Sequence, residues 1–539
     1  MVVPASPELV APASLAVLAH RYGAGAPAVV ELIRRTGGCT SPIRLEGESV
    51  AVSARSGTVL ARVSTRSQAP GFVLVACGNR RESRCPPCSE RYRRDAYFLV
   101  AAGLAGSEEK GVSTGVASHP LVFATFTAPS FGAVHRRLVD AGGGARRCRA
   151  SGEGQECEHG IPMRCPERHA EGDPKIGQAL CSDCYDYEAA ALWNANLGGL
   201  WRRTMTYLPR ELAALSRLSV AALRSQVRVA YAKVAEFQAR GAVHVHAVIR
   251  LDGPYGPDTA PAGGATAQRL AEAVARTAAR VAVTVAGPDG RELIIRWGSQ
   301  VDVRTITRNP SDGDADGNAV AGYLAKYATK DAGVGGGLDR RIRVKGVIER
   351  AEISDHARAL MRSAWTLSPR WAHNLGFRGH FLTKARRYSV TFAALRGVRA
   401  EYRAQADPWL SEIRAKAIGD QVVIRRGFHY AGSGLSPAER AIAASFRASP
   451  TWGVSAGSSS AIKSPAIAAK APSWSRRTNS ACAAGAGRAA TSTRPARDDD
   501  PERRGIRRRE RRKGPGRSCF GTSSSCRSRA SRCARSIRP

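Results

Sequence analysis

Two histidines in one apolar run, His244 and His246, are the residues whose type and spacing first suggest chemistry. They lie in the segment 241–251, which is otherwise apolar up to Arg250. Such a run predicts a β-strand, in which positions i and i+2 point to the same face. Two neighbouring imidazoles can bind a metal ion. The alternative interpretation is a structural pair of histidines in the core or on the surface.

A glutamate in the preceding segment can complete this site. Residues 227–238 also predict a strand, and the loop 239–241 ends in glycine before the histidine strand begins. A three-residue hairpin loop with a left-handed glycine at its last position is common. That loop places Glu236 opposite His244, with the Cβ atoms roughly 5 Å apart. A two-residue loop would turn Glu236 to the other face, so the third ligand depends on the loop.

Two tyrosines and two lysines alternate later in the chain. Asn318 is a favourable helix N-cap, and the residues that follow it predict a helix. In such a helix Tyr323 and Tyr327 share one face, and Lys326 and Lys330 form a second i,i+4 pair beside them. The alternative interpretation is an amphipathic helix whose tyrosines pack in the core and whose lysines are solvated.

Four cysteines in the first hundred residues have the spacing of a zinc site. Cys85 and Cys88 form a Cys-x-x-Cys turn closed by prolines, and Cys77 precedes them by eight residues. Cys39 is the candidate for the fourth thiolate. Buried free cysteines are the alternative.

A second group offers seven candidate ligands, whereas one zinc ion takes about four. Cys181 and Cys184 are the strongest, because they form another Cys-x-x-Cys pair. Either some of the seven are spectators or two zinc ions bind, and the sequence leaves both possibilities open. The group consists of Cys148, Cys157, His159, Cys165, His169, Cys181 and Cys184.

The formal charge of +37 and the pI near 10.7 indicate a polyanionic partner, most simply a nucleic acid. Residues 456–539 carry +16 of this charge, so the rest of the chain is basic as well. No run is long enough to span a membrane, and the N-terminus does not resemble a signal peptide. We therefore expect a cytoplasmic protein without a membrane partner, whose 13 cysteines favour zinc binding over disulfides. The four cysteines of the tail, at 482, 519, 526 and 533, are left out of the zinc sites. No Gly-x-x-x-x-Gly-Lys-Ser/Thr loop occurs, so we expect no use of ATP.

Periodicity and turn residues predict an α+β protein. We expect strands over 45–52, 58–63, 121–127, 227–238, 241–251, 281–285, 292–297 and 300–306, and helices over 15–22, 28–35, 185–205, 211–223, 266–280 and 319–330.

Four regions follow along the chain. We expect an N-terminal zinc-binding region over 1–115, and a main domain over 116–395 with a cysteine- and histidine-rich insertion at about 145–190. A C-terminal extension of the folded body covers 396–455. Residues 456–539 form a basic tail that nearly lacks large apolar residues and should be disordered. The tail composition also resembles an out-of-frame reading of a GC-rich gene, which resequencing would test.

The order of these motifs resembles that of the HUH endonucleases. The threonine-rich strand at 121–127, the His-x-His strand and the helix with Tyr323 and Tyr327 are similar to their three motifs, in the two-tyrosine form. A wider likeness covers about residues 35–435. There the sequence resembles the rolling-circle replication initiators of actinobacterial plasmids and integrative elements, at 77–88, 181–187, 233–252, 319–330 and 371–384.

The resemblance implies an HUH-type central antiparallel sheet flanked by helices, and a nuclease that nicks one strand of a replication origin. Mg²⁺ or Mn²⁺, held by His244, His246 and Glu236, would polarise the scissile phosphate. A tyrosine would then form a 5′-phosphotyrosine link and free a 3′-OH, and the second tyrosine would end the round. Tyr327 is the better single candidate for the first attack, because relatives with one tyrosine keep that position.

The same resemblance implies that Lys326 and Lys330 contact phosphate or stabilise charge in the transition state. It also implies single-stranded or supercoiled origin DNA and a DNA polymerase as partners. Because the chain has no ATP-binding loop, strand unwinding would come from a host helicase. The zinc ions are expected to be structural, because closed four-ligand sites leave no open coordination position. Two alternatives remain. One is a transposase or relaxase with the same chemistry, and the other is a non-enzymatic, zinc-containing DNA-binding repressor.

Overall fold

The structure is a computed structural model, and two compact units, Met1–Ala466 and Ile467–Pro539, divide the chain. The tail predicted over 456–539 lies outside the described residues. The described residues are 12–140, 142–149, 156–287, 290–307, 315–330, 333, 336–338, 340–417 and 420–448.

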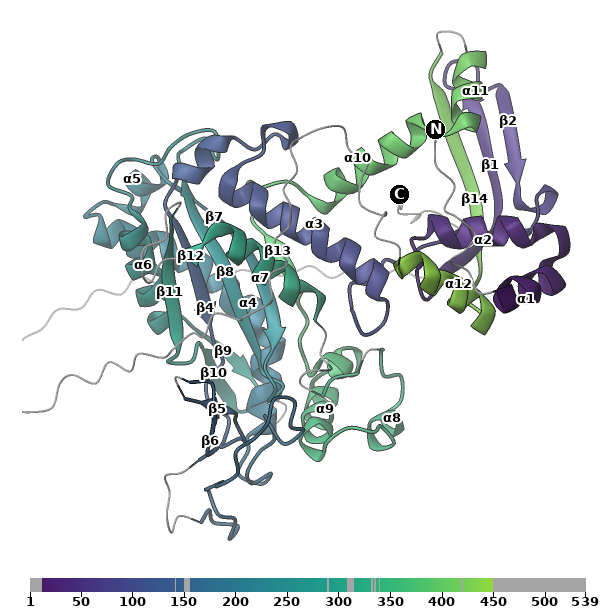
Figure 1. The fold of residues 1–539 in the computed structure, drawn as a ribbon. Coiled ribbons are helices and arrows are strands. Elements are labelled where there is room, and N and C mark those ends of the chain that lie inside the picture. Colours follow the sequence, from purple (N-terminus) through teal and green to yellow (C-terminus); the bar gives the residue numbers. More distant parts are fainter. Residues whose placement is uncertain are drawn as a thin grey trace, which may run out of the picture. The chain divides into compact units, whose positions relative to one another are not determined.

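A six-stranded sheet forms the core of the first unit, in the order β12-β11-β4-β8-β7-β13 (Figure 1). Neighbouring strands are antiparallel, except that β11 and β12 are parallel. This sheet and the helices around it confirm the predicted α+β class. The strands are β4 (Leu121–Phe126), β7 (Arg228–Phe237), β8 (Val243–Asp252), β11 (Val301–Thr307), β12 (Ala315–Asp316) and β13 (Leu382–Lys384).

Different helices cover the two faces of this sheet. On one face, alternate residues of β8 such as Val243 and Val245 share a core with α4 (Tyr187–Leu215) and α6 (Ala267–Arg280). On the other face, Val248 shares a core with α3 (Pro86–Ala105) and α7 (Gly317–Thr329). Because side chains alternate along a strand, the even-numbered residues of β8, including both histidines, lie on the α7 face.

One predicted helix is interrupted. The sequence predicted a helix over 211–223, but α4 runs through Pro209 and ends at Leu215, and α5 is a separate helix (Val220–Arg224). Between them Arg217 adopts a left-handed conformation with φ of 53°. The Ser219 side chain then accepts a hydrogen bond from Ala222 N, which is an ordinary N-cap. This cap starts a new helix where the apolar periodicity alone had predicted a continuous one.

A second sheet combines strands from both ends of the described chain. β1 (Ile43–Ser53) pairs along its length with β14 (Val422–Ser433) on one side. On its other side β1 pairs with β2 (Val59–Ser64) and β3 (Val73–Val75). The predicted boundaries at 115 and 395 stay a prediction, and this pairing joins the first predicted region to the third. A small core beside the sheet is shared by α1 (Pro12–Tyr22), α2 (Ala26–Arg35) and α12 (Pro437–Ala448).

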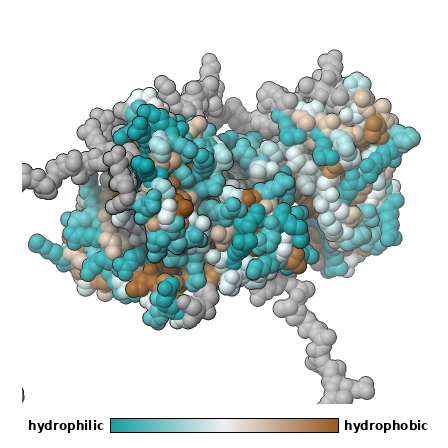
Figure 2. Space-filling view, turned by 90° about the horizontal axis from the view of Figure 1, so that it is seen from below, coloured by the Kyte–Doolittle hydropathy of each residue, from teal (hydrophilic) through white to brown (hydrophobic). Residues whose placement is uncertain are grey.

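The described residues contain four further strands and four further α-helices. None of the described helices is long and apolar enough to cross a membrane. The face in Figure 2 is mostly hydrophilic, with hydrophobic residues in separate groups. These elements are β5 (Leu138–Val139), β6 (Ala145–Arg146), β9 (Ala282–Ala286), β10 (Glu292–Arg296), α8 (Gly346–Glu349), α9 (Asp355–Leu367), α10 (Phe392–Gln405) and α11 (Pro408–Lys416).

A buried arginine attaches α3 to the sheet. Arg250 of β8 donates to both carboxylate oxygens of Asp252, at 2.6 and 2.9 Å, and to the carbonyl of Gly103 in α3. His119 Nδ1 lies 2.9 Å from Asp252 Oδ1. Charges are tolerated inside a protein when each one is paired and hydrogen-bonded. This network therefore fixes α3 on the sheet face that also carries the two histidines.

We expect Arg250→Ala to lower the free energy of unfolding by roughly 3–5 kcal/mol, because it leaves the buried Asp252 carboxylate without its arginine partner. Arg228→Ala, which removes an exposed arginine from β7, should change it by less than about 0.5 kcal/mol. Urea unfolding followed by circular dichroism measures both. Equal stability of the two variants would contradict the role given to Arg250.

Candidate active site and metal centres

The β7–β8 hairpin has the register predicted from the sequence. Glu236 lies directly opposite His244, and Phe237 opposite Val243. Gln238 N donates to Ala242 O at 2.9 Å, which leaves the three residues 239–241 as the loop. Gly241 has the left-handed φ of 75° that a three-residue loop requires.

Two further residues hold this loop, and neither was predicted from the sequence. Asn194, buried in α4, donates to the carbonyl of Gly241 at 2.9 Å and accepts from Val243 N at 2.9 Å. The guanidinium of Arg240 donates to the carbonyls of Ala128 and Pro129 at 3.0 and 2.8 Å. A polar residue inside the apolar stripe of 192–201 was the available signal for Asn194.

The hairpin brings Glu236, His244 and His246 together. Glu236 Oε2 lies 2.9 Å from His244 Nε2 and 3.2 Å from His246 Nε2. The three ligand atoms lie within 4.8 Å of one another, and all three side chains are mostly buried. Two imidazole nitrogens and one carboxylate oxygen that converge in this way form a donor set suited to a divalent metal ion.

Two neighbours orient this triad. Thr125 of β4 places its Oγ1 3.0 Å from His246 Nδ1. A metal ion on Nε2 leaves the ring proton on Nδ1, and Thr125 Oγ1 can then accept it. Lys330 Nζ donates to Glu236 Oε1 at 2.8 Å, so one carboxylate oxygen faces the lysine while the other faces the histidines.

Protonation states in the triad match metal binding. Burial would raise the pKa of the Glu236 carboxyl, but the hydrogen bonds with His244 and His246 outweigh it and lower this pKa to about 2. Burial lowers the pKa of His246 to about 4, against the opposing hydrogen bond with Glu236. At neutral pH the carboxylate is therefore charged and His246 is neutral, which are the forms that bind metal ions.

Both tyrosines of α7 lie next to His246 of the triad. The Tyr323 hydroxyl is 3.4 Å from His246 Nε2, and the Tyr327 ring centroid is 5.5 Å from that of His246. The two tyrosine rings are 4.4 Å apart. Burial raises the pKa of the Tyr323 hydroxyl, and the neighbouring Tyr327 adds to the effect. A protonated Tyr323 is therefore favoured while no cation lies beside it.

The two predicted lysines differ in position. Lys330 contacts Glu236, and its Nζ lies 4.2 Å from the centroid of the Tyr327 ring. Lys326 is exposed, and among the described residues no hydrogen bond or ion pair joins its side chain to the triad. Of the two, the structure brings only Lys330 into contact with the triad.

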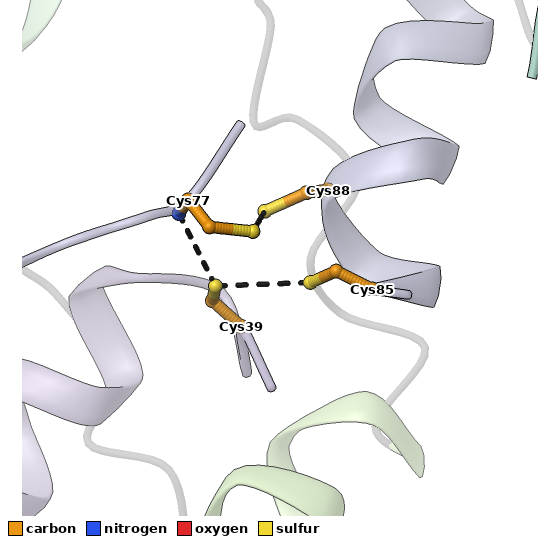
Figure 3. Close-up of side chains that lie close together, drawn as sticks. All are labelled: Cys39, Cys77, Cys85 and Cys88. Atoms are coloured by element: carbon orange, nitrogen blue, oxygen red, sulfur yellow. Dashed lines mark hydrogen bonds between the residues drawn. The ribbon is translucent and has the colours of Figure 1, made fainter. Parts of the chain in front are cut away.

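Cys39, Cys77, Cys85 and Cys88 come together in one cluster (Figure 3). Cys39 follows α2, Cys77 follows β3, and the other two lie at the start of α3. The sulfur atoms of Cys77 and Cys88, and those of Cys39 and Cys85, are 3.7 Å apart. A tetrahedral zinc ion with Zn–S bonds of about 2.3 Å separates its sulfurs by about 3.8 Å. The spacing therefore fits one structural zinc ion.

The second group of ligands separates into two sets of four. Cys157, His159, Cys181 and Cys184 form one set, in which His159 Nδ1 lies 3.3 Å from Cys184 Sγ and 3.7 Å from Cys181 Sγ. The other set contains Cys148, Cys165 and His169. Of the two possibilities left open by the sequence, this geometry favours two ions over spectator residues.

His135 completes the third set and was not predicted from the sequence. Its Nδ1 lies 3.2 Å from His169 Nε2, and Cys165 Sγ lies 3.6 Å from the same nitrogen. Asp173 Oδ2 is 2.7 Å from His169 Nδ1, as expected of a residue that orients a metal-binding imidazole. Two tetrahedral zinc sites need eight ligands, whereas the sequence offered seven candidates. The missing ligand was the indication that a further histidine or cysteine belongs to the group.

Comparison with known proteins identifies one family. The model of the RepSA family, described as the replication initiator protein of pSAM2, matches residues 25–448. A replication initiator protein of Streptomyces ambofaciens is 43% identical over 427 residues, which is 76% of this chain and 88% of that protein. No solved structure matches.

We expect Thr125→Val to weaken Mn²⁺ binding at the triad at least about tenfold, since a hydrogen bond that orients a metal-binding histidine is worth that much affinity. Thr127→Val is the matched control, because Thr127 Oγ1 donates to the carbonyl of Gln300 rather than to a triad residue. Titration of bound Mn²⁺ by electron paramagnetic resonance measures both. Equal affinities would argue against this role of Thr125.

We expect the purified protein to contain three zinc ions, one for each set of four cysteines and histidines. Cys88→Ser, Cys165→Ser and Cys184→Ser should each remove one, and the exposed His380→Ala should remove none. Elemental analysis of the purified variants by mass spectrometry counts the ions. A wild-type content of one zinc ion would show that two of the three sets do not hold zinc.

Proposed function

Because the chain belongs to the RepSA family of replication initiator proteins, we propose that it starts rolling-circle replication by nicking one strand of an origin as an HUH endonuclease. The observation that carries the proposal is that two tyrosines, Tyr323 and Tyr327, lie next to a group of one carboxylate and two histidines. Family membership favours a replication initiator over the transposase, relaxase and repressor alternatives.

The first step is a transesterification. The oxygen of one tyrosine attacks the scissile phosphorus, its proton leaves, and the bond from phosphorus to the 3′-oxygen breaks. The 3′-oxygen takes up a proton and becomes a free 3′-OH, while the 5′-phosphate stays on the tyrosine. A Mg²⁺ or Mn²⁺ ion bound by Glu236, His244 and His246 would supply the Lewis acid that neutralises charge on the phosphate.

Residues of this chain supply the remaining parts. A tyrosine hydroxyl has an ordinary pKa near 10 and is a weak nucleophile without help. Lys330 lies beside both Glu236 and Tyr327, so its positive charge can stabilise a developing phenolate or the phosphorane-like transition state. Lys326 is exposed on the same helix and is suited to DNA phosphate.

Two tyrosines allow one protein to open and close a strand without water. The first tyrosine holds the 5′ end while the 3′-OH primes synthesis. After one round, the second tyrosine attacks the regenerated junction, and the freed 3′-OH attacks the first phosphotyrosine to rejoin the displaced strand. The rings of Tyr323 and Tyr327 are 4.4 Å apart, so both can serve one phosphate site.

The proposed partners follow from this reaction. Origin DNA, supercoiled or single-stranded, is the substrate, and the basic chain offers non-specific affinity for its phosphates. Extension of the 3′-OH needs a DNA polymerase, and strand separation needs a helicase, both of which the host would supply.

The proposal predicts a covalent protein–DNA adduct when the wild-type protein meets supercoiled or single-stranded origin DNA with Mn²⁺ or Mg²⁺. Tyr323→Phe/Tyr327→Phe should reduce the adduct to background, because phenylalanine has no nucleophilic oxygen. Denaturing gel electrophoresis of end-labelled DNA detects the adduct, and the two single variants identify the tyrosine that attacks first.

Tyr430→Phe is the control, because Tyr430 is an exposed tyrosine of β14. It should form as much adduct as the wild type. Absence of an adduct with the wild-type protein across a library of candidate origins would refute the nicking activity.

A further inference from the structure

We propose that a zinc ion in the first cysteine set (Cys39, Cys77, Cys85 and Cys88) positions the tyrosine helix α7 through Arg80. This inference rests on the proposed function, because it gives Arg80 and the zinc ion a role in ordering the nicking site. Arg80 is a positioning residue, because it acts on α7 through hydrogen bonds to backbone carbonyls at the end of that helix.

Arg80 hydrogen-bonds the C-terminal end of α7. Its guanidinium donates to the carbonyl of Ala328 at 3.0 Å and to that of Lys330 at 2.5 Å. The last carbonyls of a helix have no partner within the helix, and a cation beside them is also favoured by the helix dipole. Arg80 therefore fixes where α7 ends.

The position of Arg80 is set by the cysteine cluster. The residue lies in the loop 78–84, whose two flanking residues are Cys77 and Cys85. The carbonyl of Arg80 accepts a hydrogen bond of 2.8 Å from Ser89 Oγ, next to Cys88 in the first turn of α3. A zinc ion that joins the two cysteines would close the loop and hold Arg80, its third residue, in place.

The guanidinium is also held from the other side. It lies 3.6 Å from the centroid of the Phe381 ring, within the range of a cation–π contact. Phe381 in turn accepts a backbone hydrogen bond of 2.8 Å from Ala235 N, next to Glu236 in β7. Arg80 thus connects the cysteine loop, the end of α7 and the strand that carries the triad carboxylate.

The end of α7 carries groups that serve the site. Lys330, whose carbonyl accepts from Arg80, donates through Nζ to Glu236 at 2.8 Å. Tyr327 lies within the same last turn. Movement of this turn would shift the side chains of Lys330 and Tyr327 relative to Glu236. An ordered cysteine loop would therefore keep these side chains in place at the site.

The first test compares Arg80→Ala with Arg93→Ala, which removes the same charge from an exposed position of α3. Arg80→Ala should keep the full zinc content and the wild-type melting temperature. It should weaken Mn²⁺ binding at the triad about tenfold, and it should speed hydrogen exchange of the amides at 326–330. Arg93→Ala should change neither quantity. Unchanged exchange and Mn²⁺ affinity in Arg80→Ala would overturn the proposal.

The second test is a double-mutant cycle between Arg80→Ala and Cys88→Ser. If zinc acts through Arg80, Cys88→Ser should lose one zinc ion and show the same weakening of Mn²⁺ binding. The double variant should be no worse than Cys88→Ser alone, whereas additive losses would overturn the zinc link. Should Cys88→Ser fail to fold, Arg80→Lys decides instead. Both carbonyl hydrogen bonds come from the single nitrogen Nη1, and a lysine ammonium also has N–H groups for both. Arg80→Lys should therefore restore part of the Mn²⁺ affinity that Arg80→Ala loses, and no restoration would count against the carbonyl contacts.

These tests do not depend on DNA cleavage. Hydrogen exchange and Mn²⁺ affinity report on the link between the cysteine set and α7 even if the protein forms no adduct. Failure of the adduct assay with normal Arg80 effects would therefore refute the nicking activity alone.

Discussion

Pairing of Glu236 with His244 across a three-residue turn is the constraint on which the site depends. Side chains alternate between the faces of a strand, so a slip of one residue would carry the carboxylate into the apolar core under α4. Gly241 permits the turn, Asn194 of α4 holds it from outside, and Arg240 within the turn donates to the carbonyls of Ala128 and Pro129. Several hydrogen bonds with distant segments thus stabilise this one register of β7 and β8. The helix α7 packs on the sheet face that the register defines.

The negative charge of Glu236 is already paired with the positive charge of Lys330 in the absence of substrate. Glu236 is a buried anion, and its two oxygens face in different directions, one toward the histidines and one toward Lys330. A low-dielectric surrounding strengthens each of these interactions. Charged carboxylate, neutral imidazole and ammonium group together suit a divalent cation and a phosphate, whose charges complement one another.

Local patterns were sufficient to predict which residues come together in the candidate site, whereas partners distant in sequence were not predictable. The triad comes from one hairpin, and the tyrosines are one helical turn apart, so alternation and i,i+4 spacing identified them. The division of the cysteines and histidines depends on how the loops between β4 and α4 fold, and no periodicity indicates that His135 joins His169. Similarly, Ile43 pairs with Ser433, and neither strand carries a signal that names its partner.

The β1–β14 pairing also sets an order of events during synthesis. A chain emerging from the ribosome has completed β1, β2 and β3 long before residues 422–433 exist, so β1 presents an unpaired edge while the whole six-stranded sheet is made. Unpaired edges are sites of misassociation between chains. Arg44 likewise has no ion-pair partner until its buried partner, Glu439, has been synthesised. The N-terminal part of the protein therefore matures last, although it is translated first, and chains that stop before residue 422 would remain vulnerable to aggregation and proteolysis.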